Sequence, residues 1–242
     1  MNKYEICYFQ CSTCNFIQTE NPFWLEEAYN SAITNSDIGM MQRNLTLKQF
    51  TQAIIQFCFY SGGRFLDYGG GYGIFVRMMR DTGFDFSYYD AYCENIFAKG
   101  FEGSLFHENY EMITAFEVFE HLANPYEDIE KMLNVSDSIL FTTELLPVCN
   151  PKPEEWWYYG LEHGQHISFF THKSLREIAI RYGLNLYSNG SSLHLLSKRK
   201  ISPLFQMVSN YKVAYILNII TRKKSLLEKD YNSLTCKKVY YD

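Results

Sequence analysis

The chain has 242 residues and a formal net charge of -5, from 22 basic and 27 acidic side chains. The length fits one α/β domain with a small additional segment. The acidic balance argues against a nucleic-acid-binding protein, because a surface that follows phosphates needs clustered Lys and Arg. Aromatic residues make up 17% of the chain, which is compatible with core packing and with a ligand pocket.

The cysteines and the N-terminus indicate the cellular compartment. There are seven cysteines, an odd number, and the N-terminus is polar and lacks the apolar core of a signal peptide. We therefore expect a reduced, cytoplasmic protein. No stretch approaches the ~18 apolar residues that span a bilayer, so we expect no transmembrane segment.

Hydrophobic periodicity predicts helices and strands in alternation. The predicted strands are short apolar runs at 64–68, 86–89, 111–115, 138–142, 184–187 and 193–196. The predicted helices are 46–60, 74–80, 118–122, 125–133 and 174–182. This order predicts an α/β fold, with a Rossmann-like, mainly parallel sheet covered by helices on both faces.

The same pattern divides the chain into three expected parts. Residues 1–45 form a small N-terminal segment that contains cysteines, or a lid, and residues 46–200 form the main domain. Residues 201–242 form a helical extension with apolar residues at helical spacing and Lys and Arg after Thr221. Packing on the domain, a homodimer contact and contact with an anionic lipid surface all remain open for this extension.

The most informative motif is a glycine loop between a predicted strand and a predicted helix. It reads Asp67-x-Gly69-x-Gly71-x-Gly73, and glycines there let the backbone adopt positive φ and approach a ligand. The nicotinamide fingerprint requires a glycine where Ile74 stands, which disfavours an oxidoreductase. Asp90 ends the next strand, where a carboxylate can accept both hydrogen bonds of a ribose diol.

Together with the string at 113–122 and Asn124-Pro125, these residues resemble the class I S-adenosylmethionine-dependent methyltransferases over roughly residues 60–200. The resemblance implies S-adenosylmethionine as cofactor and S-adenosylhomocysteine as product. It also implies a set of cofactor-binding residues: Asp67, Gly69, Gly71, Asp90, Ala91, Tyr92, Phe116 and Glu117. In this set Asp90 binds the ribose, while Phe116 and Glu117 border the sulfonium. Arg43 is a candidate partner for the cofactor carboxylate, with an exposed loop as the alternative.

The N-terminal segment carries Cys7, Cys11 and Cys14. Its Cys-x2-Cys unit matches one knuckle of a zinc ribbon, but a structural zinc needs four ligands and no second such unit occurs. Residues 8–29 resemble the end of the zinc-binding region in sugar C-methyltransferases and related polysaccharide methyltransferases, with the first half missing. We assign no metal ligand, expect reduced thiols, and leave a bound zinc open.

A dense aromatic and histidine segment follows the strand at 138–142. The run Trp156, Trp157, Tyr158 and Tyr159 fits neither a strand nor a helix period, which favours a pocket wall over a regular core element. We expect these four residues and Gln165 to bind the acceptor. Residues 164–170 again resemble the polysaccharide-associated methyltransferases, which implies a sugar or surface-polysaccharide precursor, sugar-nucleotide or lipid-linked.

Methylation of a hydroxyl needs a base, and an imidazole suits that role near neutral pH. His166 is the first candidate, His163 the second and Glu144 the third; a scaffold role is the alternative for His166. We interpret His121 as structural or as bordering the pocket.

The sequence thus predicts O-methylation of a small acceptor. The alternatives are a methyltransferase for another small metabolite and a catalytically silent cofactor-binding partner protein.

Overall fold

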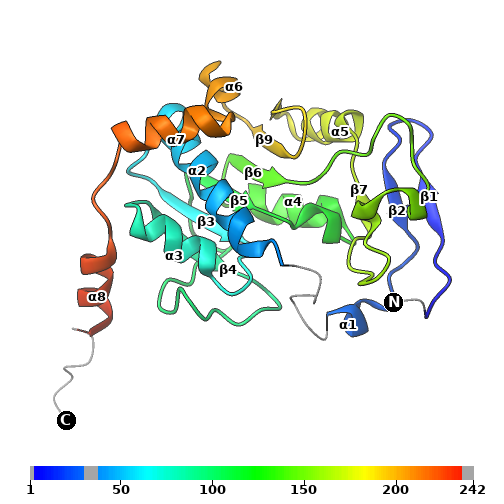
Figure 1. The fold of residues 1–242 in the computed structure, drawn as a ribbon, viewed down its shortest axis with the longest axis horizontal. Helices are drawn as coiled ribbons and strands as arrows, with labels where there is room; N and C mark the ends of the chain where they lie inside the picture. The colour runs from blue at the N-terminus through cyan, green and yellow to red at the C-terminus, as the bar shows by residue number, and fades with distance from the viewer. Residues whose placement is uncertain (1–2, 30–37, 236–242) are drawn as a thin grey trace, which may run out of the picture. The chain divides into compact units, whose positions relative to one another are not determined.

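The structure is a computed structural model that describes residues 3–29 and 38–235. The chain forms two compact units, whose elements are labelled in Figure 1. The glycine-loop unit, named for the motif it contains, comprises Gly39–Thr114 and Ile201–Asp242. The histidine unit comprises Met1–Ile38 and Ala115–Lys200.

The glycine-loop unit is built on parallel strands. β3 (Arg64–Tyr68) pairs in parallel with β4 (Asp85–Tyr89) and with β5 (Met112–Ala115). Phe65 and Leu66 are fully buried, as a strand covered on both faces requires. All three strands match their predicted positions to within one residue.

Helices of the same unit pack around α2 (Met40–Cys58), which contacts α3 (Ile74–Asp81), α6 (Leu204–Val208) and α7 (Tyr211–Ile220). α2 begins six residues before its predicted start, because its first two turns contain the polar run 42–44, which hides the apolar periodicity. The last helix is α8 (Leu227–Thr235).

The predicted helical extension is divided into α6, α7 and α8 rather than one continuous helix. The break before α7 is made by Asn210, whose side chain accepts hydrogen bonds from the N–H groups of Lys212 and Val213. α8 is held to α3 by Asp230, which accepts hydrogen bonds from Arg77 and Arg80.

The histidine unit contains β6 (Ser138–Thr142), β9 (Leu193–Ser197) and β8 (Asn185–Ser188), joined in antiparallel pairs. β6 agrees with its predicted bounds, and the two later strands agree to within one residue at each end. The helices α4 (Pro125–Leu133) and α5 (His172–Tyr182) also match their predictions. α5 begins two residues early, because the Thr171 hydroxyl caps it by accepting from the Ser174 N–H.

A second, smaller sheet lies in the histidine unit and was not predicted. β2 (Ile17–Thr19) pairs in antiparallel fashion with β1 (Tyr8–Gln10) and with β7 (Ser168–Phe169). Strands of two or three residues are too short to show an alternating pattern. The remaining short elements are α1 (Leu25–Ala28), η1 (Phe119–His121), η2 (Pro153–Glu155) and η3 (Trp157–Tyr159); the helix expected over 118–122 is therefore a single 3-10 turn.

The strand order of the six-stranded sheet is β4-β3-β5-β6-β9-β8. Helices lie between β3 and β4, between β5 and β6, and between β6 and β8, and this arrangement confirms the expected α/β fold class. Within residues 3–29 and 38–235, no helix has the length and apolar character to cross a membrane.

Candidate active site

The glycine loop of the glycine-loop unit requires its glycines. Gly69, Gly71 and Gly73 have φ values of 71°, 55° and 82°, in the left-handed region that side chains disfavour. A Cβ at Gly73 would also lie 2.6 Å from Asn95 Oδ1. α3 begins directly after this loop, so its first N–H groups border the same space.

Asp67 lies near the end of β3, directly before the glycine loop. Its side chain is buried, and Thr114 donates a hydrogen bond to Oδ1 at 2.6 Å. Burial raises the pKa of Asp67 to about 7; the hydrogen bond from Thr114 lowers it, and the negative charge of Asp90 raises it further. Asp67 is therefore a buried carboxyl group next to the loop, and its role in supporting the loop stays a prediction.

Asp90 connects the glycine loop to the turn after β4. Its Oδ2 accepts from the Gly71 N–H at 2.9 Å, and its Oδ1 accepts from the N–H groups of Tyr92 and Cys93 at 2.8 and 2.9 Å. A carboxylate has about four acceptor sites, so one remains for a ribose hydroxyl. Tyr92 is 91% exposed and Ala91 is also exposed; their place beside the adenine stays a prediction.

Arg43 lies in the first turn of α2. Its backbone N–H bonds to Gly39 O, and a Cβ at Gly39 would lie 3.4 Å from the Arg43 guanidinium. The guanidinium thus folds back over the start of α2. Its pairing with the cofactor carboxylate stays a prediction.

Phe116 and Glu117 follow β5 in the histidine unit, and both are partly buried. Glu117 has φ = 54°, an uncommon conformation for a residue other than glycine. Its N–H donates to Thr142 Oγ1 at 2.8 Å, and the same hydroxyl donates to Glu117 Oε1 at 2.8 Å. A strained residue held by a buried side chain is typical of a functional site.

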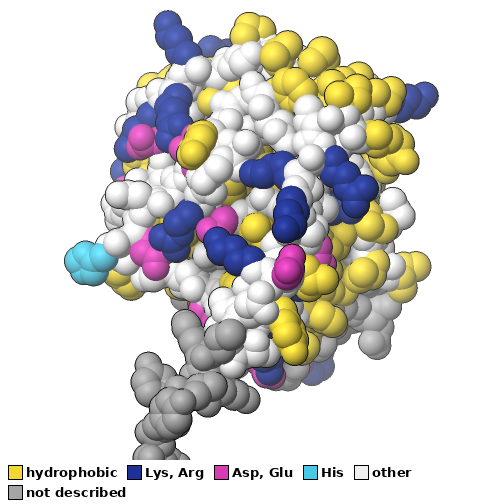
Figure 2. Space-filling model, turned by 90° about the vertical axis from the view of Figure 1, so that its left-hand side faces the viewer, with side chains coloured by type: hydrophobic (Ala, Val, Ile, Leu, Met, Phe, Trp, Pro, Cys, Tyr) yellow, Lys and Arg dark blue, Asp and Glu magenta, His cyan; other side chains and the backbone are white. Residues whose placement is uncertain are grey.

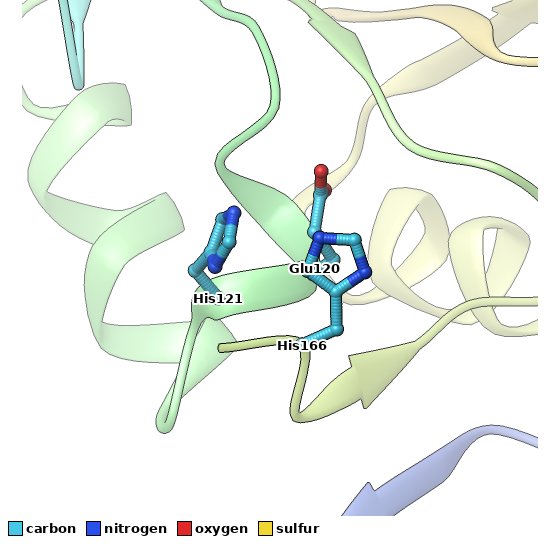
Figure 3. A group of neighbouring side chains, drawn as sticks. All are labelled: Glu120, His121 and His166. Atoms are coloured by element: carbon cyan, nitrogen blue, oxygen red, sulfur yellow. The ribbon is translucent and has the colours of Figure 1, made fainter. Parts of the chain in front are cut away.

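Glu120, His121 and His166 gather in the histidine unit, as Figure 3 shows. One potential metal-ligating atom from each lies within 4.8 Å of the other two. Glu120 and His121 come from η1, and His166 precedes β7. The two segments are joined by the hydrogen bond from the Ile167 N–H to Glu120 O at 2.8 Å.

The electrostatics of this cluster are set by burial. Burial raises the pKa of Glu120 well above its usual range, and the negative charge of Glu117 adds to the shift; the hydroxyls of Tyr158 and Thr143 oppose it. Burial lowers the pKa of His121 to about 4, so its imidazole is neutral near pH 7. The cluster therefore combines a neutral imidazole with a carboxyl group in an environment that disfavours its charge.

The other two base candidates lie in the same unit. His163 Nδ1 accepts from the Gln165 N–H at 3.1 Å, and its ring centroid is 4.9 Å from that of His166. Glu144 is half-buried. Burial and the negative charge of Glu117 raise its pKa, whereas a hydrogen bond with the Ser192 hydroxyl lowers it. His163 thus lies beside the first candidate, and the roles of all three stay predictions.

The aromatic run is divided between core and surface. Tyr158 and Tyr159 are buried in a cluster with Ile17, Leu146 and Phe169, whereas Trp157 is 76% exposed. This corrects the expectation that the run lies outside the core: the 3-10 turn η3 directs successive rings to different sides. Gln165 is buried and donates to Ala28 O at 2.8 Å. An acceptor-binding role for the four aromatic residues and Gln165 stays a prediction.

Cys11 and Cys14 lie in the turn between β1 and β2, whereas Cys7 precedes β1 at the other end of this hairpin. The N–H groups of Cys14 and Thr13 lower the pKa of the Cys11 thiol. All six cysteines in the described parts of the chain are unpaired thiols, and Cys236 lies outside these parts. Over 3–29 and 38–235, Cys7, Cys11 and Cys14 do not come together as a three-ligand group.

A parallel strand followed by a loop of positive-φ glycines and a helix is typical of proteins that bind a nucleotide-containing cofactor. Residues 41–189 match the family model described as a methyltransferase domain, which covers more than half of the chain. The chain therefore belongs to this methyltransferase-domain family, as the sequence analysis expected. No curated protein matches the sequence.

Solved structures agree on the fold. An O-methyltransferase family protein from Burkholderia thailandensis has a TM-score of 0.54 at 10% identity, over 73% of this chain and 63% of that protein. The chain thus spans less than two thirds of that relative. A chain in the complex of the Haloferax volcanii Trm112 methyltransferase activator with a methyltransferase has a TM-score of 0.50 at 16% identity, over 75% of this chain and 98% of its own length.

Proposed function

We propose that this protein transfers a methyl group from S-adenosylmethionine to a hydroxyl of a small acceptor, a sugar or another surface-polysaccharide precursor. The observation that carries the proposal is the glycine loop with Asp90 in a chain of the methyltransferase-domain family. The sugar-type acceptor rests on the resemblance of residues 8–29 and 164–170 alone, which is an argument by analogy.

The residues of the glycine loop fit a nucleoside with a charged amino-acid tail. Three positive-φ glycines leave room for close approach, and a Cβ at Gly71 would meet no atom within 4 Å. Asp90 keeps an acceptor site for the ribose, and Arg43 supplies a positive charge for the carboxylate. When bound, S-adenosylmethionine supplies an electrophilic methyl carbon.

His166 assists loss of the acceptor proton. Its Nδ1 lies 2.6 Å from Tyr158 O, an oxygen that can only accept, so Nδ1 carries the ring proton and Nε2 carries the lone pair. The acceptor oxygen then forms the new C–O bond as the C–S bond breaks, with the electron pair leaving on sulfur. Orientation of the two reactants supplies much of the acceleration. His163 and Glu144 are the second and third candidates for the same proton.

Calorimetry with S-adenosylmethionine, S-adenosylhomocysteine and NAD tests the cofactor. We expect both sulfur nucleotides to bind and NAD not to bind; a folded protein that binds neither sulfur nucleotide would contradict the proposal. Formation of S-adenosylhomocysteine with a panel of sugar nucleotides and other hydroxyl compounds then tests the acceptor. A His166→Ala variant that binds cofactor normally and keeps the wild-type rate would remove His166 from the mechanism.

The location and assembly of the protein are proposed on weaker grounds. Reduced thiols at the described cysteines favour the cytoplasm. On α7, Ile216, Ile219 and Ile220 are 57–74% exposed, close in sequence to Arg222. Figure 2 shows hydrophobic side chains next to Lys and Arg on the face that carries α7 and α8. Such a surface suits a second copy of the chain or a lipid-linked acceptor. Light scattering and vesicle binding distinguish the two.

A further inference from the structure

We infer that Glu120, His121 and His166 form a binding site for a divalent transition-metal ion such as zinc. One ligand atom from each side chain lies within 4.8 Å of the others, and all three residues belong to the histidine unit (Figure 3). The site is separate from the N-terminal cysteines, which the sequence analysis weighed as a zinc segment.

The carboxylate of Glu120 supplies the first independent support. Its side chain is fully buried, and within residues 3–29 and 38–235 neither of its oxygens accepts a hydrogen bond of good geometry, although the hydroxyls of Tyr158 and Thr143 lie close to them. A buried polar group without a partner is rare and destabilising. A bound cation would interact favourably with this carboxylate and balance its charge, which accounts for an acid at a position without other partners.

The hydrogen bonds of the two imidazole rings supply the second independent support for a metal site. Histidines that bind metals usually donate their other ring N–H to a carbonyl or carboxylate, which fixes the ring and the tautomer. His121 Nδ1 lies 3.0 Å from Gln165 O, and His166 Nδ1 lies 2.6 Å from Tyr158 O. Both oxygens are backbone carbonyls, so both Nδ1 atoms carry protons and both Nε2 atoms carry the lone pairs that bind a metal.

The separation of the ligand atoms allows a shared ion. Two ligands on one tetrahedral zinc ion lie about 3.4 Å apart, because each bond is about 2.0–2.2 Å long. From separations of up to 4.8 Å, movements of about 1–1.5 Å close the site.

The ligand set selects the metal. Two imidazoles and a carboxylate suit zinc and neighbouring first-row ions better than magnesium or calcium, which prefer all-oxygen sites. Three protein ligands leave a coordination position open, as in catalytic rather than structural zinc sites.

The role of the ion rests on the proposed function, although its binding does not. An acceptor hydroxyl at the open position would be acidified by the metal, and its proton would pass to solvent water. The oxygen would then form the C–O bond as the C–S bond breaks. The Nε2 lone pair of His166 would hold the ion, so the metal would replace direct proton acceptance by His166.

Calorimetry and absorption spectroscopy with ZnCl2 and CoCl2 test the site in the full chain, without S-adenosylmethionine or acceptor. We expect one ion per chain and a cobalt spectrum without a thiolate charge-transfer band. His121→Asn and His166→Asn should each weaken binding more than about tenfold. His172→Asn, at an exposed histidine of the same unit, should bind as the wild type does.

A Cys11→Ser/Cys14→Ser variant identifies the competing site. Loss of binding in this variant, with normal binding by the two histidine variants, would place the ion at the cysteines and overturn the proposal. Failure of the wild type to bind either ion would also overturn it. Glu120→Gln is informative only if it folds, which circular dichroism reports; His121→Asn and His166→Asn provide the test in either case. S-adenosylmethionine binding in metal-free buffer tests the proposed function separately.

Discussion

The Thr142 hydroxyl holds Glu117 at two points, accepting from its backbone N–H and donating to its carboxylate, both at 2.8 Å. Glu117 keeps a positive φ of 54° through these bonds. The strand β6 thus fixes the turn that follows β5, where the family resemblance places the sulfonium of the cofactor.

Thr142→Val should remove both bonds and keep the shape of the side chain. Because Thr142 is buried, we expect a loss of about 1–3 kcal/mol in the free energy of unfolding and weaker binding of S-adenosylmethionine. Urea unfolding and calorimetry measure the two effects. Thr142→Ser keeps the hydroxyl and should recover most of both; equal losses in the two variants would show that the hydroxyl is not the cause.

Asp90→Ala should weaken S-adenosylmethionine binding by at least about tenfold, because hydrogen bonds to a charged group contribute about 1.5–3 kcal/mol. The variant also removes the acceptor for Gly71, Tyr92 and Cys93. Glu94→Ala is the control, since its carboxylate is exposed and forms a surface ion pair with Lys99. Unchanged affinity in Asp90→Ala would exclude the ribose assignment.

Asp67→Asn should reduce the pH dependence of stability. The pKa of Asp67 is about 7 in the folded chain against an ordinary value of 3.8, so between about pH 4 and pH 7 the folded state retains a proton that the unfolded chain has lost. This contribution to the free energy of unfolding, on the order of 4 kcal/mol, is therefore lost as pH rises through that window.

The asparagine can still accept from Thr114 but has no carboxyl proton to lose. Unfolding free energies of both proteins from pH 4 to pH 8 should converge in acid and separate in favour of Asp67→Asn above pH 7. Parallel curves would show that Asp67 titrates normally.

Asp230→Ala should destabilise the glycine-loop unit by about 3 kcal/mol, because it leaves the buried Arg80 guanidinium without its bidentate partner. Denaturant unfolding measures the loss, and limited proteolysis should detect release of α8. Glu228→Ala, in the same helix as Asp230, removes an exposed ion pair with Lys224 and should change stability by less than about 0.5 kcal/mol. Similar effects in both variants would contradict a special role for Asp230.

Much of the core could be predicted because its strands contain short runs of consecutive apolar residues. β3 and β6 are buried on both faces, so Arg64–Tyr68 and Ser138–Thr142 stand out against their polar and glycine-rich flanks. The small sheet could not be predicted, since β7 has only two residues and is a strand through its pairing with β2.

The glycine loop was predictable because glycine spacing reports backbone conformation directly. The cluster of Glu120, His121 and His166 was not, because 45 positions separate the two histidines. Their proximity depends on the bond between Ile167 and Glu120, which no residue pattern encodes. The packing of Tyr159 against Phe169 is likewise a property of the fold.

The pairing of β2 with β7 also affects the choice of boundaries for fragments of this protein. The recognisable family region starts at residue 41, yet the Thr19 N–H donates to Ile167 O, one residue beyond His166. A fragment that starts at residue 41 and keeps the rest of the chain would retain every histidine but lose β2, which pairs with the segment next to His166. Homologues that lack this hairpin would need another segment to pair with β7. Chimeras that exchange N-termini should be tested for whether the new segment restores this pairing.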